Sequence, residues 1–383
     1  MSQTEVQLIK ADAVQTADIA NSAVSDAKIA GLTSSKLTGA LPAISGASLT
    51  NLPASGKASN LIINGAMQVA QRGTSATSAT NGYHTVDRWG QSNGGLDNAA
   101  TMAQVDVASG TTPYTLGFRK AYKITNGDQS SVGTGDYYRI YQFIEAQNAA
   151  TSGWNYISPS SDITVSCWVK SSVAQNFYIE LRTQDGTQQA YIWETGSLSA
   201  NTWTKITKTI PGNSNIQIDN DNSHGPCLFI HLFNGTTMTG TMTLNQWAAY
   251  NTSIRTPDMT STWYDTNDAT FEMTGVQLEV GSTATDFEHR SFAQELLLCQ
   301  RYYAEAGTVL ANAEPQRYHN TISLPVEMRA GVTRTAMSID SGSGGNMYPT
   351  WDSSGGASSK RQFYQSPVNS AISNAIISFD SEL

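Results

Sequence analysis

The sequence predicts a mainly β protein with an N-terminal fibrous shaft, an antiparallel β-sandwich of the jelly-roll kind, one linking helix and a small C-terminal β-domain. Three observations support this prediction. Short runs of alternating polar and apolar residues recur between clusters of Gly, Asn, Ser and Asp. The first part of the chain has no aromatic residue. One segment late in the chain changes from the two-residue period of a strand to helical spacing.

Residues 1–58 are expected to form an anchor and shaft. They also lack Cys and His, and β-branched residues recur every five positions at Val14, Ile19, Val24 and Ile29. Such a segment is too poor in large apolar groups to build a core by itself. A disordered linker is one interpretation. The regular spacing favours the other, a shaft in which several copies of the chain wind together.

Residues 59–290 are expected to form the sandwich. Aromatic residues appear from "NLIINGAMQVAQRG" onwards, and about eight strand-like runs follow at short intervals, as in jelly-roll domains. In "DITVSCWVK" the apolar alternation indicates that Cys167 is a buried thiol. Trp168, Trp193 and Trp203 also lie inside strand patterns, so we expect them to pack in the core or between the sheets.

The last strand of the sandwich is expected to contain a bulge. In "GVQLEVG", Val276 and Leu278 alternate with polar residues, which is the period of a half-buried strand. Met273 has the opposite parity, so the strand must change face between Met273 and Val276. A bulge at Gly275 would allow this.

Residues 291–383 are expected to form the last part of the chain. It would consist of a helix over residues 292–304 and a small C-terminal β-domain, with the helix linking this domain to the sandwich. Ser291 and Gln294 form a capping box at its start, and Gly307 is the expected stop. With helical spacing, one face of the helix carries Phe292, Leu296, Cys299 and Tyr303.

Composition and charge narrow the function. Only 14% of the 383 residues are charged and the net charge is −9, which argues against a nucleic-acid partner and an acidic membrane surface. No apolar stretch approaches the ~18 residues of a membrane span, and the N-terminus lacks the pattern of a signal peptide. The three cysteines are widely spaced, so we expect no disulfide framework.

No catalytic or metal centre is expected, and no cofactor. "QIDNDNSHG" alternates acidic residues as a calcium loop does, but His224 and Ile230 stand where an EF-hand requires Gly and Glu. A polar turn or a looser cation site are the remaining interpretations. His231 is expected to be a strand residue, since the histidines lack zinc-ligand spacing. The paired carboxylates of polysaccharide-cleaving enzymes are not apparent, so we expect no enzyme.

Aromatic residues in polar loops are the candidates for sugar binding, because a sugar offers apolar C–H patches ringed by hydroxyls. One group lies in "MTSTWYDTND" and the other in the Gly- and Ser-rich loop 344–356. Structural packing or a subunit contact is the alternative role for each ring. The candidates are Trp263, Tyr264, Asn346, Tyr348, Trp351 and Asp352.

Several stretches resemble a tail-fibre family of bacteriophages that is frequent in phages of cyanobacteria and marine bacteria. The resemblance covers residues 59–383 and is most specific over 275–303. "ALPAISGASLTNLP" also resembles a shaft repeat of phage adhesins. The family often has Pro after "MRA", where this chain has Gly331 and Val332. The matching stretches are "LIINGAMQVAQRG", "YHTVDRWG", "SCWVKSS", "NTWTKITKTIPG", "TGVQLEVGSTATDFEHRSFAQELLLCQRYY" and "LPVEMRA".

The resemblance implies a homotrimeric virion fibre that binds a host surface polysaccharide through a domain similar to carbohydrate-binding modules. Residues 1–58 would attach it to other virion proteins of the tail, baseplate or capsid. The protein would be made in the host cytoplasm and reside in the virion, in a tail fibre or, alternatively, a capsid fibre. A trimer axis would cover the helix 292–304, which is apolar nearly all round. The alternative function is a structural fibre without receptor recognition.

Overall fold

The computed structural model describes residues 60–308, 318–330, 333–339, 348–349, 361–366 and 375–382. These residues all belong to one compact unit, 56–383. The predicted shaft, residues 1–58, lies outside the described residues. Within the described residues, no helix has the length and apolar character needed to cross a bilayer.

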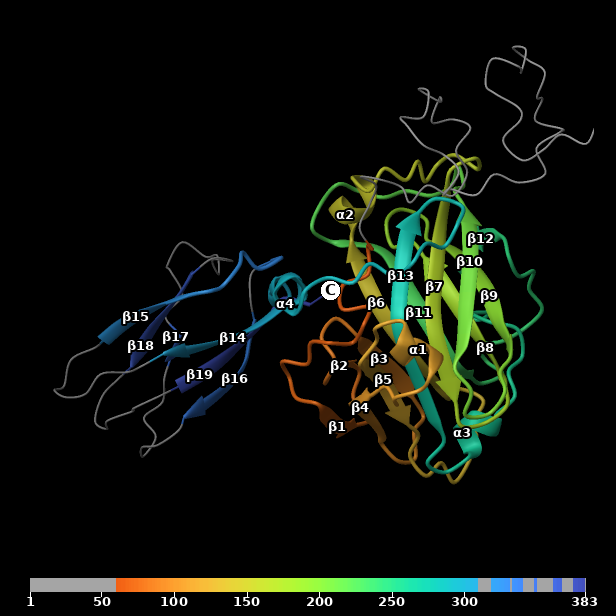
Figure 1. Ribbon diagram of the computed structural model, residues 1–383, viewed down its shortest axis with the longest axis horizontal. Helices are drawn as coiled ribbons and strands as arrows, with labels where there is room; N and C mark the ends of the chain where they lie inside the picture. The colour runs from red at the N-terminus through yellow and green to blue at the C-terminus, as the bar shows by residue number, and fades with distance from the viewer. Residues whose placement is uncertain are drawn as a thin grey trace, which may run out of the picture. The chain divides into compact units, whose positions relative to one another are not determined.

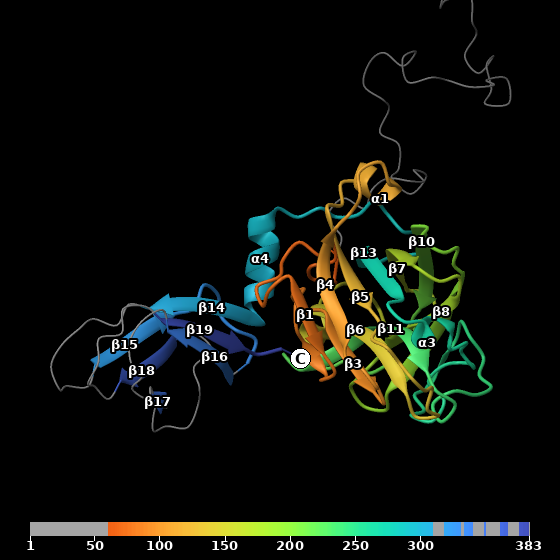
Figure 2. The same ribbon diagram turned by 90° about the horizontal axis from the view of Figure 1, so that it is seen from below.

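Two antiparallel sheets stack face to face and form a sandwich (Figures 1 and 2). Sheet A contains, in spatial order, β1 (Ser75–Ser78), β4 (Ala100–Asp106), β5 (Lys120–Thr125), β13 (Thr270–Val280), β7 (Asp162–Ser171) and β10 (Thr204–Pro211). Sheet B contains β12 (Trp247–Ala249), β9 (Gln189–Ser197), β8 (Asn176–Arg182), β11 (His224–Asn234), β6 (Tyr137–Glu145), β3 (Gly90–Gly94) and β2 (Gly82–Tyr83). The chain passes repeatedly from one sheet to the other, which confirms the predicted jelly-roll class.

Three short helices connect these strands, and they are α1 (Thr112–Thr115), α2 (Ala146–Ala150) and α3 (Thr262–Asp265).

The main core lies between the two sheets, where the apolar residues of each alternating strand meet. Cys167 belongs to this core, as predicted, and the three cysteines are free and buried. Trp193 is also a core residue, as expected. Trp168 and Trp203 instead pack, partly buried, against a separate cluster around Phe118. The strand pattern therefore identified Trp193 correctly but did not show that the other two belong to a different cluster.

The predicted bulge in β13 is confirmed. The register between β13 and β7 shifts between Thr274 and Gln277. Gly275 has a φ of 61°, a left-handed conformation that glycine adopts at little cost. A Cβ at this position would lie 2.5 Å from Cζ of Phe118. Both the backbone angle and the close approach of this ring therefore require glycine.

The linking helix α4 (Phe292–Gln300) begins at the predicted capping box. The Ser291 hydroxyl accepts a hydrogen bond from the backbone of Gln294 at 3.3 Å, and the Gln294 side chain accepts one from the backbone of Ser291 at 3.0 Å. The predicted end was wrong, since Tyr303 already begins β14 (Tyr303–Thr308) and Gly307 lies within that strand. Backbone pairing with a distant strand ends the helix early, a tertiary effect that helical spacing does not contain.

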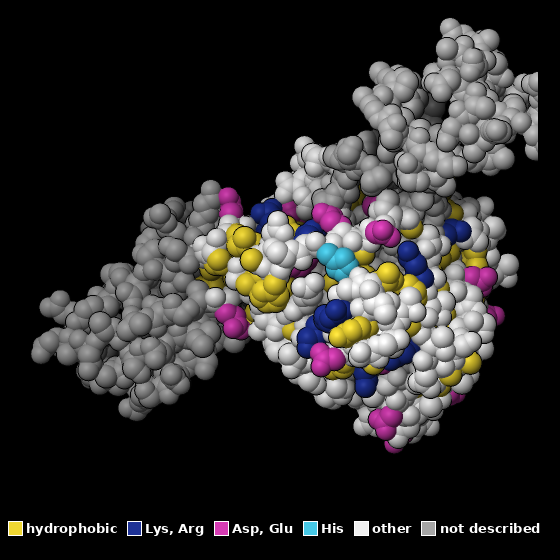
Figure 3. All heavy atoms as spheres, viewed as in Figure 1, with side chains coloured by type: hydrophobic (Ala, Val, Ile, Leu, Met, Phe, Trp, Pro, Cys, Tyr) yellow, Lys and Arg dark blue, Asp and Glu magenta, His cyan; other side chains and the backbone are white. Residues whose placement is uncertain are grey.

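The predicted face of α4 is confirmed at Cys299 and at the half-buried Leu296, whereas Phe292 is exposed. Glu295 and Cys299 are buried. The Glu295 carboxylate accepts a hydrogen bond from the backbone N–H of Asn64, which directs this side of the helix inward. Figure 3 shows hydrophobic side chains gathered over α4. The exposed ones are Phe292 (56%), Leu297 (47%) and Leu298 (36%).

Two small sheets follow α4 and account for the predicted β structure at the C-terminal end. One contains β14, β19 (Ala375–Asp380) and β16 (Thr333–Ile339). The other contains β15 (Tyr318–Ser323), β18 (Arg361–Ser366) and β17 (Tyr348–Pro349). The last described residues contact the sandwich domain, where Arg72 lies 3.0 Å from Asp380 and Arg88 pairs with Glu382.

Candidate functional site

Trp263 and Tyr264 lie in the core, which corrects the prediction that they bind sugar. Helix α3 places both rings inside the sandwich, and each side chain is 0% exposed. The Tyr264 ring stacks on Phe233 with 4.4 Å between centroids. Polar side chains from distant segments anchor this helix, since Asn126 donates to the backbone oxygen of Tyr264 and Gln175 accepts from the backbone N–H of Trp263 at 2.8 Å. A fully buried ring cannot stack on a sugar.

The other candidates remain predictions. Asn346, Trp351 and Asp352 lie outside the described residues. Tyr348 begins β17 and pairs with Gln365 across the strands. The proposed role of the loop 344–356 is therefore unchanged by the structure.

A different group of residues gathers on the face of sheet B that points away from the core. Alternation along β6 sends Tyr138, Ile140 and Ile144 into the core. The residues between them face outward. Residues paired across neighbouring strands share a face, so the register defines two outward rows. These rows are Gly90–Tyr141–Phe229–Glu180 and Ser92–Arg139–His231–Tyr178.

Two glycines of β3 allow tyrosine rings to lie close to the sheet. A Cβ at Gly90 would lie 2.4 Å from Cζ of Tyr141, and one at Gly94 would lie 2.7 Å from Cε1 of Tyr137. Each ring therefore occupies the space that a side chain on β3 would fill. Both tyrosines remain partly exposed. The sheet thus presents aromatic surface beside its edge strands.

A buried polar chain lies on the same face of sheet B. His231 donates from Nε2 to the Glu180 carboxylate at 2.8 Å, and its Nδ1 accepts from Asn234 at 3.1 Å. Asn234 also donates to the hydroxyl of Thr256 at 3.1 Å. Burial lowers the pKa of His231, and the positive charge of Arg139 adds to this effect while Glu180 opposes it. His231 is therefore neutral at neutral pH.

The Glu180 carboxylate is ionised. Burial opposes its ionisation, but Arg182, His231 and Arg139 outweigh this effect, so the pKa of Glu180 lies below its ordinary value. Arg182 is 3.6 Å from the carboxylate through its Nε. The buried part of the face thus holds one negative charge.

Three arginines stack on the aromatic rings of this face. The guanidinium of Arg182 lies 4.2 Å from the ring centroid of Phe229 and 4.0 Å from that of Tyr250. Arg139 lies 4.8 Å from the Phe229 centroid. Both Arg139 and Arg255 approach the ring of Tyr137, at 5.6 and 5.3 Å. Such contacts hold a guanidinium in place.

We call this group the arginine–tyrosine surface, and it comprises Tyr137, Arg139, Tyr141, Arg182, Tyr250 and Arg255. Nε and Nη1 of Arg139 and Nε and Nη1 of Arg255 have no hydrogen-bond partner within the described structure. Sequence reasoning missed these residues, although the alternation in "DYYRIYQF" already places Tyr137, Arg139 and Tyr141 on one side of a strand. No local pattern in the sequence shows that Arg182 and Arg255 lie beside these residues.

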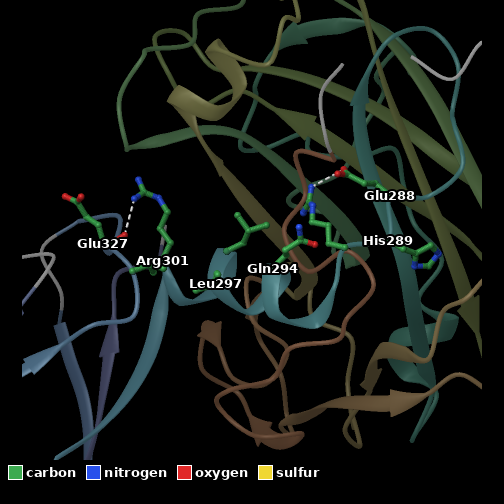
Figure 4. A pocket seen from close by; sticks show the side chains of 9 residues that line it. Glu288, His289, Gln294, Leu297, Arg301 and Glu327 are labelled. Carbon is green, nitrogen blue, oxygen red and sulfur yellow. Dashed lines mark hydrogen bonds and ion pairs between the residues drawn. The ribbon is translucent and has the colours of Figure 1, made fainter. Parts of the chain in front are cut away.

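A pocket of about 780 Å³ lies beside α4 (Figure 4). It is lined by Leu297 and Leu298 of the helix and by charged residues that include Arg290 and Arg301. Arg301 is held by Glu145, with 2.7 Å between Nε and Oε1. Within the described residues, no group of three His, Cys, Asp or Glu is arranged to hold a metal ion.

No family model and no curated protein matches this sequence. Among solved structures, one similar chain is the enzymatically active domain of tailspike protein 4 of bacteriophage CBA120, with 12% identity and a TM-score of 0.30, covering 58% of this chain and 21% of that one. A putative sugar binding protein from Bacteroides thetaiotaomicron has 11% identity and a TM-score of 0.31, with 58% and 100% covered. The family 11 carbohydrate-binding module from Clostridium thermocellum has 11% identity and a TM-score of 0.27, with 55% and 98% covered.

Proposed function

We propose that this protein binds a glycan as part of a virion fibre and attaches the particle to a host surface polysaccharide. The arginine–tyrosine surface is the observation that supports glycan binding. It combines partly exposed tyrosine rings with hydrogen-bond donors that have no partner among the residues that the structure describes. A sugar can stack its C–H face on a ring while its oxygens accept hydrogen bonds from neighbouring donors.

The virion part of the proposal rests on the sequence resemblance of residues 59–383 to phage tail fibres. In this proposal residues 1–58 attach the fibre to other virion proteins in the tail, baseplate or capsid. A structural fibre without recognition is the alternative function.

The proposal includes a homotrimer. The exposed apolar side chains Phe292, Leu297 and Leu298 lie together on one short helix. Leu297 and Leu298 also line the adjoining pocket. Apolar surface of this kind on one element favours burial against another chain. We propose that other copies of the same chain cover these side chains. The repetitive N-terminal segment favours this, because it needs copies of itself to form a shaft.

Binding without cleavage is also proposed. Glycosidases need a carboxyl group placed to protonate the leaving oxygen of the substrate. The carboxylate beneath the arginine–tyrosine surface belongs to Glu180, which is fully buried and hydrogen-bonded to His231. Its hydrogen bond links two neighbouring strands of sheet B, and the buried carboxylate is not placed to act on a bound sugar.

The proposal is tested with the purified full chain on an array of bacterial surface polysaccharides. We expect binding to particular polysaccharides and no release of oligosaccharides over a long incubation. Tyr137→Ala should weaken binding, because it removes a ring from the surface. Tyr114→Ala is the matched control, since Tyr114 is also a partly exposed tyrosine that stacks on an arginine, at 4.0 Å from Arg119, but lies in another cluster.

Two results would contradict the proposal. Failure to bind any polysaccharide would favour the structural fibre, and sustained depolymerisation would show that the protein is an enzyme.

A further inference from the structure

We infer that the glycan bound at the arginine–tyrosine surface is acidic, and that Arg139 and Arg255 hold a carboxylate or sulfate group of it. This inference rests on the proposed glycan-binding function and specifies the chemical class of the ligand. Both guanidinium groups approach the same ring, that of Tyr137, at 5.6 and 5.3 Å from its centroid. A ligand that contacts this ring can therefore reach both arginines.

The local charge is the first argument. The chain as a whole carries a net charge of −9. The arginine–tyrosine surface has three guanidinium groups, and the buried carboxylate of Glu180 lies beneath them. His231 adds no positive charge, because its Nδ1 accepts a hydrogen bond from Asn234 and its pKa is lowered. A positive surface within an acidic protein is suited to an anionic ligand.

The unpaired donors are the second argument. Nε and Nη1 of Arg139, and the same two atoms of Arg255, are buried without a hydrogen-bond partner in the described structure. Leaving buried donors unpaired is unfavourable. A carboxylate or a sulfate ester offers several oxygens, so it can accept from one N–H group of each of the two guanidinium groups at once. A neutral hydroxyl offers one oxygen and leaves more donors unpaired.

The mutual repulsion of the arginines is the third argument. Burial lowers the pKa of Arg139, and the charges of Arg182 and Arg255 lower it further, while Glu180 opposes them. The surrounding structure therefore holds like charges near one another. An anion placed between them would replace this repulsion with attraction. A neutral sugar would not.

The guanidinium of Arg182 and the backbone of Arg255 are held in position before any ligand binds. Arg182 lies between two aromatic rings. The backbone N–H of Arg255 donates to the carbonyl oxygen of Met238 at 2.7 Å, and the next residue, Thr256, is buried and bonded to Asn234. Preorganised donors lose little conformational freedom on binding, which favours affinity.

The test compares charged and neutral forms of the same polymer by isothermal titration calorimetry on the full chain. One pair is polygalacturonate and its carboxyl-reduced form, and the other is dextran sulfate and dextran. We expect binding to at least one acidic polymer, with affinity that falls as salt increases, and at least about tenfold weaker binding to its neutral form. The acidic polymer that binds identifies the substituent as carboxylate or sulfate.

Arg139→Gln should weaken binding of the acidic polymer by about tenfold or more, because it removes charge-assisted hydrogen bonds. Arg119→Gln is the control, since Arg119 also stacks on a tyrosine but lies outside this surface. Circular dichroism checks that both variants are folded, and the polymer comparison requires no variant.

Equal binding of the acidic and neutral forms would overturn the inference while leaving glycan binding intact. An equal effect of Arg119→Gln would also overturn it, because the interaction would then be general electrostatic attraction. Absence of binding to every polysaccharide on the array and in the calorimeter would instead contradict the proposed function itself.

Discussion

His231 donates a hydrogen bond to Glu180 across 2.8 Å, and both side chains are completely buried beneath the arginine–tyrosine surface. The pair belongs to the supporting layer of that surface, while Tyr137, Arg139 and Arg255 form its partly exposed layer. Substitutions in the two layers should therefore have different effects. The buried layer should determine stability and the exposed layer should determine binding.

Replacing Glu180 with Leu should reduce the free energy of unfolding by about 3–5 kcal/mol, because it leaves buried positive charge without its partner. Urea denaturation followed by tryptophan fluorescence measures this change. Glu194→Gln is the control, because Glu194 is exposed on the neighbouring strand and should change stability by less than about 0.5 kcal/mol. Equal effects of the two substitutions would show that the buried carboxylate has no special role.

Stability should depend on pH through His231. Burial lowers its pKa in the folded protein below the ordinary value of 6.5. Below about pH 6.5 the unfolded chain therefore binds a proton that the folded chain does not, so stability is fully present above this pH and falls as pH decreases. Asp87 acts in the opposite direction, because burial raises its pKa to about 6 and favours the folded state at lower pH.

Comparison with His231→Gln separates the two effects. Unfolding free energies measured from pH 5 to 8 should fall more steeply with decreasing pH in the natural protein than in the variant. The same slope in both proteins would contradict the role assigned to His231.

Gly275→Ala should destabilise the protein by about 1–3 kcal/mol, because the residue has a positive φ and Phe118 occupies the space of the new methyl group. Gly281→Ala is the matched control. Gly281 also has a positive φ, of 134°, but nothing lies within 4 Å of its Cβ position. Thermal unfolding of both variants should show a larger loss for Gly275→Ala. The reverse order would mean that Phe118 moves aside easily.

Leu297→Glu should convert the proposed homotrimer to monomers without unfolding the chain. The side chain is 47% exposed in the single chain, so a charge there is tolerated until another copy must cover it. Sedimentation equilibrium should give three copies for the natural protein and one for the variant. Ile157→Glu is the control, because Ile157 is 54% exposed on a different segment. A natural protein that sediments as a monomer would contradict the homotrimer.

Trp351→Ala should weaken adsorption to host cells with almost no change in melting temperature, if the loop 344–356 is a distal contact with the receptor. Trp263→Ala should do the opposite, with a loss of about 3–5 kcal/mol of stability, because its ring is fully buried. Normal adsorption together with a large loss of stability in Trp351→Ala would show that Trp351 is also a packing residue. Recognition would then rest on the arginine–tyrosine surface alone.

The sequence by itself determined the features that depend on neighbours along the chain. Two-residue alternation identified the strands and the burial of Cys167, because strand geometry fixes which residues share a face. The change of parity before Val276 located the bulge at Gly275. The capping box at Ser291 located the start of α4, since it involves residues only three apart.

Only the tertiary structure decided the features that depend on distant segments. α4 ends before Tyr303 because that residue pairs with Asp380, which lies far away in the sequence. Trp263 is buried because its helix lies at the end of the sandwich, whereas its polar neighbours suggested an exposed loop. Arg139, Arg182 and Arg255 come from three separate segments and meet only through sheet pairing and an anchored loop. Contacts of this kind are set by strand order and register, which local patterns of residues do not specify.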